Sequence, residues 1–393
     1  MSNWEGEPLD DIMNHGFFRI ANPGPLHAPI QNFTIRRNEK LELELETHCP
    51  EDAKSNAIQY SSGTVRVNTD AVELINPGGI KARAVGVQPL RVETSINYKS
   101  GERGLREKSR IFHYVEAAIR DNLDPAYTIE WFDNLGVRDF IWPNTINYNK
   151  NIAETRIIGN DNGVALTSTD NEHSFGQGCV GFSVTDAQLY LCGSSESNPR
   201  KGSKLGCIVY VGTPDEDTRR KVRDAVSYAL NTYLVYLGNT VYSADWQTIS
   251  FRSVGAYSIG RRVFDLPVLP PAPLGPRFQH EITVPALSRL VNGIYAQYDA
   301  LKFGSLSWAY WHALCATTHI SGIHFGALIE ALQRNYVQAH PESFQSKLVP
   351  NGAKWRCLSR EIKEAISRVN IPDADKAILI RKVSNLNQMP RAC

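Results

Sequence analysis

Three residues near the end of a long apolar stretch have the side chains that metal-independent RNA cleavage requires. They are Arg334, Asn335 and His340. In such cleavage the ribose 2′-hydroxyl is the nucleophile, so one group with a pKa near neutrality must move a proton and a permanent cation must face the phosphate. Histidine and arginine meet these needs, and Asn335 can orient the imidazole or hold the phosphate. The triplet is the candidate catalytic site.

A structural interpretation of the same triplet stands beside the catalytic one. Cationic side chains in the last turn of a helix stabilise its exposed carbonyl groups, and Pro341 ends the pattern. In a chain with ten histidines, an arginine followed by a histidine five to seven residues later is expected about twice by chance. Two such pairs occur, Arg106 with His113 and Arg334 with His340. Spacing alone does not separate the two interpretations.

The element that must carry the triplet is the stretch from Ser305 to His340. Its apolar residues recur mostly at intervals of three and four, and no proline interrupts it before Pro341. The pattern predicts one long helix that is central and mostly buried. His312 and His319 share a face of this helix, but residues seven apart lie about 10 Å apart along the axis, too far to bind one metal ion. We therefore interpret these histidines as hydrogen-bonded interior residues and predict no metal site.

A second candidate surface follows the long helix. Residues 347–393 contain ten basic and four acidic side chains, a net charge of +6. Such a surface suits the phosphate backbone of RNA or DNA, and the alternative is a solvated face of two surface helices. The candidate nucleic-acid-binding residues are Lys354, Arg356, Arg360, Lys363, Arg381 and Lys382. Arg356, Arg360 and Lys363 lie at helical spacing on one side, which favours the binding interpretation.

Composition limits the remaining classes of function. The 393 residues carry 42 basic and 41 acidic side chains, so no global charge attracts nucleic acid or an anionic membrane. The N-terminus lacks an apolar segment, and no run of eighteen apolar residues occurs, so we expect neither a secretory signal nor a membrane span. Seven cysteines form no Cys-x-x-Cys pair. We expect a reduced, cytoplasmic protein without structural metal or cofactor.

The N-terminal half alternates between short runs of β-forming residues and turn residues. Clean alternation in LELELE, from Leu41 to Glu46, and the Asn-Pro-Gly turns at Asn22 and Asn76 are typical of an antiparallel sheet. One helix is expected within this region, over about 109–121, where Ile111, Val115, Ala118 and Ile119 make one face. The half is otherwise predicted to be a two-layer β domain.

The pattern changes after Thr213. Residues 214–237 predict a helix that begins at Pro214, has acidic residues in its first turn and ends at Gly238. A proline-rich connector spans 267–276, and helical patterns follow over 285–303, 353–369 and 374–386. The predicted fold class is α+β, with a β-rich domain at 1–213, a helix and connector at 214–279 and a helical domain at 280–393.

The succession of these segments resembles a known family. A β-rich half, a proline-rich approach and the segments LSWAYWHALCATTHISGIHFGALIEAL, WRCLSREIKEAI and LIRKVSNLNQMP resemble the ApeA-like branch of the HEPN superfamily. The resemblance implies a bacterial anti-phage protein whose helical domain is a ribonuclease, with two Arg-x4-6-His motifs meeting across a homodimer. In that family the motif usually lies on a helix after the segment that corresponds to LIRKVSNLNQMP. Either Arg334 to His340 is the motif displaced, or the catalytic helix is missing and the chain cannot cut RNA unaided.

Two functions from different classes remain. In the first, a defence protein of HEPN type senses a phage-derived trigger with its β domain and attacks or binds RNA with its helical domain. In the second, the chain is a non-catalytic subunit of a larger defence complex that binds nucleic acid or acts as a scaffold. The discriminating feature is whether an arginine and a histidine from two chains converge.

Overall fold

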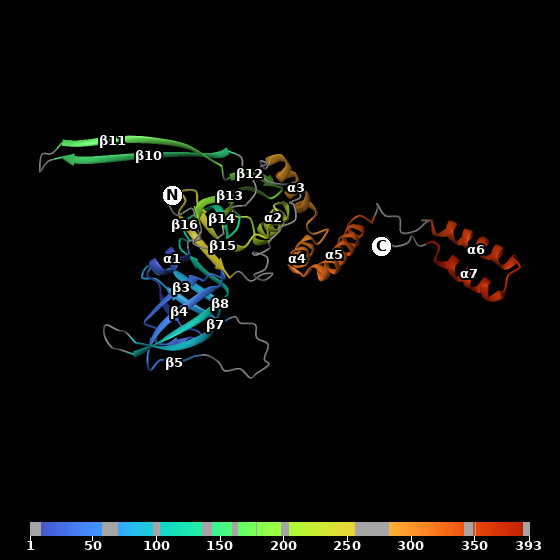
Figure 1. The fold of residues 1–393 in the computed structure, drawn as a ribbon, viewed down its shortest axis with the longest axis horizontal. Coiled ribbons are helices and arrows are strands. Elements are labelled where there is room, and N and C mark those ends of the chain that lie inside the picture. The colour runs from blue at the N-terminus through green and yellow to red at the C-terminus, as the bar shows by residue number, and fades with distance from the viewer. Residues whose placement is uncertain are drawn as a thin grey trace. The chain divides into compact units, whose positions relative to one another are not determined.

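The chain has an α+β fold, as predicted, and divides into two compact units, Met1–Ala296 and Gln297–Cys393 (Figure 1). We call them the sheet unit and the helical unit. The computed structural model describes residues 9–56, 70–96, 103–135, 144–158, 164–177, 179–197, 204–255, 283–341, 349 and 351–387. The proline-rich segment 267–276 and the expected strand 64–67 lie outside these residues.

The sheet unit is built on a twelve-stranded antiparallel sheet, with most strands in the order β1-β6-β7-β8-β16-β15-β9-β14-β13-β12 and with β3 and β4 paired beside β8. The strands of this sheet are β1 (Arg19–Asn22), β3 (Asn32–Arg37), β4 (Leu43–Pro50), β6 (Ala71–Ile75), β7 (Lys81–Ile96), β8 (Arg103–Ala118), β9 (Pro125–Phe132), β12 (Cys179–Val184), β13 (Ala187–Ser197), β14 (Lys204–Val211), β15 (Tyr236–Ser243) and β16 (Thr248–Val254). Two further pairs are β2 (His27–Ala28) with β5 (Lys54–Ser55) and the hairpin β10 (Asn144–Ile158) with β11 (Val164–Gln177).

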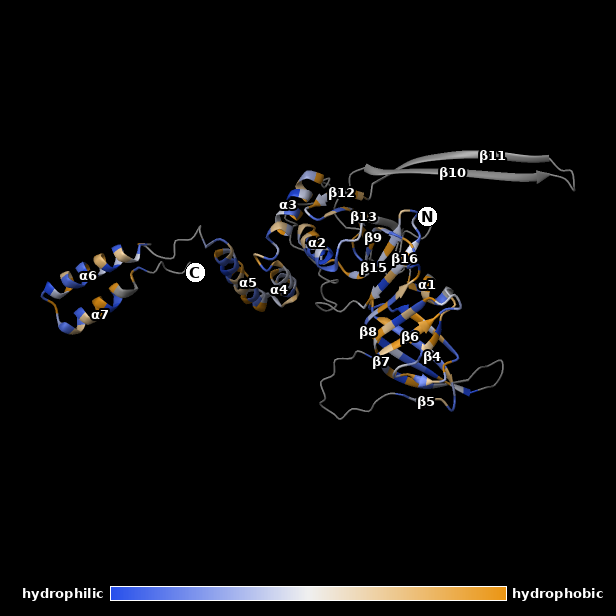
Figure 2. Ribbon diagram, turned by 180° about the vertical axis from the view of Figure 1, so that it is seen from behind, coloured by the Kyte–Doolittle hydropathy of each residue, from blue (hydrophilic) through white to orange (hydrophobic). Residues whose placement is uncertain are grey.

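The predicted alternation is present in β4, whose residues alternate between buried and half-buried positions along the strand. The same alternation appears as orange and blue bands along β4 in Figure 2. Both Asn-Pro-Gly turns are also found. The Asn22 side chain accepts a hydrogen bond from Gly24 N, and the Asn76 side chain accepts one from Ile80 N. Gly24 and Gly79 have φ angles of 56° and 83°, which glycine adopts most easily.

The helix expected over 109–121 is wrong, because these residues belong to β8 and the turn after it. Ile111, Val115 and Ala117 are buried on one face of the strand. Residues four apart share a face in a strand as well as in a helix, so the spacing from 111 to 115 fits both. Residues 109–118 form a strand because they pair with β7, β4 and β16 in the sheet.

The predicted helix at 214–237 is too long. The helix α2 (Glu216–Ala229) begins where the Asp215 side chain accepts a hydrogen bond from Thr218 N, and it ends well before Gly238. Asn231, with a left-handed φ of 47°, turns the chain toward β15. Strands β15 and β16 then insert between β8 and β9, so residues 236–254 complete the twelve-stranded sheet.

Helix α2 packs through Val222, Ala225 and Val226 on apolar side chains of β9, β14, β13 and β12. Helix α3 (Val284–Gln297) joins the same cluster through Leu287 and Val291. A second cluster joins α1 (Leu9–His15) to the strands β3, β4, β6, β7 and β8, and a third involves β9, β14 and β15. Burial of these side chains on both faces is the main stabilising contribution to the sheet unit.

The described residues of the helical unit form two helix pairs. The single long helix predicted from Ser305 to His340 is wrong, because the chain forms α4 (Phe303–Cys315) and α5 (Thr318–Ala339) with extended backbone at Ala316 and Thr317. Thr317 is the first residue of a threonine pair, and threonine favours the position before a helix over its interior. Burial was also predicted wrongly, since Asn335 is the one residue of α5 that is buried.

The predictions for the last two helices are confirmed to within a residue or two, whereas the helix expected over 285–303 is α3 and ends earlier, at Gln297. The last pair consists of α6 (Gly352–Arg368) and α7 (Asp373–Asn385), close to the expected 353–369 and 374–386. The Asn351 side chain accepts hydrogen bonds from Ala353 N and Lys354 N and so begins α6. Val349 and Asn387 exchange two hydrogen bonds, which tie the entry of this pair to its exit.

Candidate functional site

The triplet Arg334, Asn335 and His340 lies at the C-terminal end of α5. Asn335 is buried, and its side-chain amide donates a hydrogen bond of 2.7 Å to the carbonyl oxygen of Leu301. This contact anchors α5 to the chain just before α4. Arg334 is exposed, and His340 follows the last turn with its ring 4.6 Å from that of Tyr336. Within one chain, helix geometry places residues six apart on different sides and about 9 Å apart along the axis.

The predicted basic face is partly assembled on α6. Arg356, Arg360 and Lys363 line one shallow groove of about 600 Å³ together with Arg368 and the half-buried Trp355. Among the described residues that line the groove, Glu364 is the single acidic one. The other predicted binding residues, Lys354 on α6 and Arg381 and Lys382 on α7, are exposed and do not line this groove.

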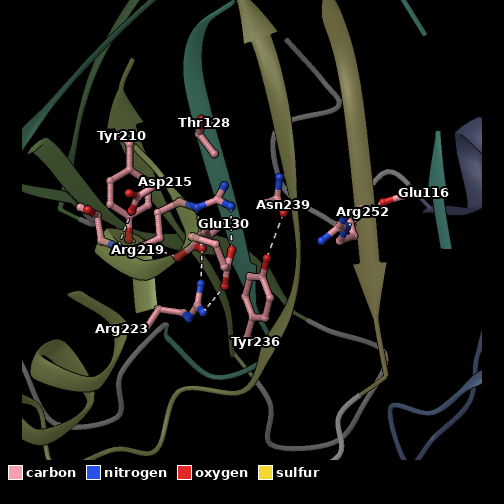
Figure 3. Close-up of polar contacts among 12 residues, drawn as sticks. Glu116, Thr128, Glu130, Tyr210, Asp215, Arg219, Arg223, Tyr236, Asn239 and Arg252 are labelled. Atoms are coloured by element: carbon pink, nitrogen blue, oxygen red, sulfur yellow. Dashed lines mark hydrogen bonds and ion pairs between the residues drawn. The ribbon is translucent and has the colours of Figure 1, made fainter. Parts of the chain in front are cut away.

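A polar site that the sequence did not indicate crosses the sheet unit. Six residues from six adjacent strands stand in register and therefore on the same face of the sheet, and we call them the polar row. The polar row consists of Glu73 (β6), Arg83 (β7), Glu116 (β8), Arg252 (β16), Asn239 (β15) and Glu130 (β9). Part of it is drawn in Figure 3. Charged side chains alternate in sign over its first four positions.

The part of the polar row on β7, β8 and β16 is held by ion pairs. Glu116 accepts hydrogen bonds of 2.9 and 2.6 Å from Arg252 and a further short one from Arg83. Both arginines also lie over the ring of Tyr114, at 4.5 and 5.7 Å from its centroid. The guanidinium groups of Arg83 and Arg252 therefore share the carboxylate of Glu116.

At its inner end the polar row passes beneath α2. Glu130 is fully buried and forms an ion pair with Arg223, while Arg219 Nε lies 3.6 Å from the same carboxylate oxygen. The hydroxyl of Tyr210 donates to the other oxygen at 3.1 Å. Arg219 and Arg223 approach Glu130 from opposite sides, Arg219 from the side of Thr128 (Figure 3). They also share Glu216, at 2.7 and 2.6 Å, which balances their charge.

Burial perturbs the protonation equilibria of this cluster. It raises the pKa of Glu130, although the ion pairs with Arg223 and Arg219 act in the opposite direction. It also raises the pKa values of Tyr210 and Tyr236, so both hydroxyls remain protonated donors. For Arg223, burial acts to lower the pKa, but Glu130, Tyr236 and Glu216 outweigh burial and raise it. The cluster is therefore built around permanently charged guanidinium groups.

A groove of about 770 Å³ opens over the polar row next to α2. Its charged lining residues are Lys81, Arg83, Arg219, Arg252, Glu73 and Glu116. The sequence contained one usable signal for this site, the basic residues Arg219, Arg220 and Arg223 beside the acidic start of α2. The strand register that gathers the other residues could not be read from spacing.

Among the described residues, no group of histidine, cysteine, aspartate or glutamate side chains is arranged to hold a metal ion, and no helix is long and apolar enough to cross a membrane. Comparison with known proteins adds no identity. No family model matches the chain, and neither a curated protein nor a solved structure is significantly similar to it.

Proposed function

We propose that this chain is a bacterial anti-phage defence protein that binds RNA through its helical unit. The observation that carries the proposal is the groove on α6, where four cationic side chains, Arg356, Arg360, Lys363 and Arg368, meet one carboxylate. Cations spaced along one helix face suit successive phosphates, and the indole of Trp355 beside them can stack on a base. The defence role and the phage-derived trigger rest on the family resemblance alone.

The apolar surface of the helical unit supports a second part of the proposal, self-association. Helix α5 exposes Ile320, Ile323, Ile329 and Leu332, which are between 44 and 72 % accessible. At 100° per residue, Ile320 and Ile323 share one side of α5, and Ile329 and Leu332 share the opposite side. Apolar residues on both sides are typical of a helix that packs against neighbours, and a homodimer or a larger complex formed through the helical unit would supply them.

Binding is tested by charge reversal of Arg356, Arg360 and Lys363 to glutamate together. The affinity for a single-stranded RNA should fall, and its salt dependence should flatten by roughly one unit of slope for each phosphate that the variant no longer neutralises. The matched control reverses Lys40, Arg91 and Arg103, three exposed cations of the sheet unit. An equal decrease in both variants would show a general charge effect, and no decrease in either would assign the α6 face to solvent.

Cleavage of RNA by Arg334 and His340 is the second candidate function. It is favoured by the position of these residues at the end of α5, where Arg334 is exposed and His340 is only half-buried. The reaction needs a dimer that brings the arginine of one chain to the histidine of the other. It should proceed in EDTA and leave a 2′,3′-cyclic phosphate.

The decisive variant is His340→Ala, which should abolish cleavage, with His324→Ala, an exposed histidine of the same helix, as the control. Because Asn335 anchors α5, its replacement would report on structure as well as on catalysis. Cleavage retained in His340→Ala, or absent from the wild-type dimer, would leave the non-catalytic binding subunit as the better interpretation.

A further inference from the structure

The groove over the polar row has the size and lining of a small-molecule site. Its volume of about 770 Å³ falls within the roughly 300–1,000 Å³ typical of ligand pockets. The described residues that line the groove all belong to the sheet unit, and each comes from a strand, from α2 or from the turn before α2. The site is therefore independent of the RNA surface proposed for the helical unit.

Two hydrogen-bonding side chains that line the groove are held in place by contacts within the sheet unit. The Arg219 side chain is 11 % exposed, and its guanidinium group pairs with Glu216 at 2.7 Å and lies 3.6 Å from Glu130. Asn239 receives a hydrogen bond of 3.0 Å on its side-chain oxygen from the Tyr236 hydroxyl, which lies beside it in Figure 3. That contact fixes the amide so that its nitrogen remains a donor.

The charge of the lining also favours an anion. Four basic residues, Lys81, Arg83, Arg219 and Arg252, line the groove against two carboxylates, Glu73 and Glu116. Arg83 and Arg252 share Glu116, and no ion pair joins Lys81 to any of the residues that the structure describes. Glu130 and Glu216 balance the positive charges of Arg219 and Arg223. The excess positive charge of the groove therefore lies on β7 and β16, which carry Lys81, Arg83 and Arg252.

We infer that this groove binds a small molecule through a phosphate group, with Arg219, Arg252 and Asn239 as its main donors. These donors come from three elements, α2, β16 and β15, and so approach a ligand from different directions. A tetrahedral phosphate has acceptor oxygens for all of them, whereas a planar carboxylate has two oxygens in one plane. The volume left beside the phosphate accommodates a group about the size of a nucleoside.

The test is calorimetric titration of the full chain with adenosine monophosphate, inorganic phosphate and adenosine. Both phosphate compounds should bind and compete with each other, while adenosine should not bind. Arg252→Gln, a change at a half-exposed position, should weaken binding of the monophosphate about tenfold, since a charge-assisted hydrogen bond contributes about that factor. The matched control is Arg91→Gln, on the same strand as Arg83 but outside the groove.

Arg219→Gln should weaken binding at least as much, and its circular dichroism would show whether it folds. If the Arg219→Gln variant does not fold, Arg252→Gln and Lys81→Gln test the inference in its place, because both side chains are more exposed than that of Arg219. Absence of binding of either phosphate compound at millimolar concentration would overturn the inference. Equal affinities of the wild type, Arg252→Gln and Lys81→Gln would overturn it as well. Neither result would bear on RNA binding by α6.

Discussion

The two units differ in where their apolar side chains lie. In the sheet unit, three buried clusters occupy both faces of the sheet, and Arg83 and Arg252 of the polar row are ion-paired with Glu116 across strands. Of the seventeen large apolar side chains found exposed among the described residues, twelve belong to the helical unit, which is about a quarter of the chain. The sheet unit is therefore complete by itself, whereas the helical unit presents surfaces suited to a partner.

The largest effect is expected from removing the buried side chain at the centre of the sheet unit. Glu130→Ala leaves a cavity and removes the contacts of this side chain with Arg219, Arg223 and Tyr210, so the free energy of unfolding should fall by about 3–5 kcal/mol. Urea denaturation followed by fluorescence measures it. In the control Glu216→Ala, a half-exposed partner of the same arginines, the decrease should stay below about 1 kcal/mol. Similar decreases in both variants would contradict the central role of Glu130.

A smaller effect is expected from the anchor of the helical unit. Asn335→Ala removes the hydrogen bond to the Leu301 carbonyl and leaves that acceptor unpaired, which should cost about 1–2 kcal/mol. Hydrogen exchange of the α5 amides measures this change locally. Arg334→Ala, the neighbouring exposed residue, should change protection by less than about 0.5 kcal/mol. If protection fell as far in the arginine variant, the anchor would lie elsewhere.

The pH dependence of stability sharpens the comparison further. Because burial raises the pKa of Glu130 in the folded chain, the folded state holds a proton more tightly than the unfolded state does. The contribution of Glu130 to stability is therefore greatest at pH values below the ordinary carboxyl pKa and falls as the pH rises through the raised value. Relative to Glu130→Gln, the wild type should lose stability as the pH is increased from 4. A difference that does not vary with pH would contradict the raised pKa.

The smallest effect on folding is expected where the helical unit exposes apolar side chains. Ile323 is 72 % exposed, so Ile323→Ser should change the free energy of unfolding of the monomer by less than about 0.5 kcal/mol. If α5 mediates self-association, the same variant should shift sedimentation toward monomer. Leu90→Ser, an exposed position of the sheet unit, is the control and should leave the distribution unchanged.

The sequence predicted features that depend on neighbouring residues and missed those that depend on distant ones. The alternation of β4, the turns at Asn22 and Asn76 and the limits of α6 and α7 could be predicted because each is decided within a few residues. The error over 109–121 arose because local spacing fits a helix and a strand alike, and three strand neighbours decide the outcome.

The candidate sites show the same limit. Arg356, Arg360 and Lys363 share a helix face, so their common groove could be predicted from spacing alone. The polar row gathers Glu73, Glu116, Glu130, Asn239 and Arg252 through strand register, which no local pattern records. The role of Asn335 as an anchor likewise depends on a carbonyl 34 residues away in the chain.

The position of the β15–β16 hairpin has a consequence for synthesis of the chain on the ribosome. Strands β8 and β9 are consecutive in the sequence but not adjacent in the sheet, because this later hairpin lies between them. The contact between Glu116 and Arg252 spans 136 residues. Until the hairpin emerges, the growing chain has two open strand edges, which are prone to wrong pairing and aggregation. We expect the nascent protein to depend on chaperones up to about the time that residue 254 leaves the exit tunnel, and sheet closure to be a slow, late step.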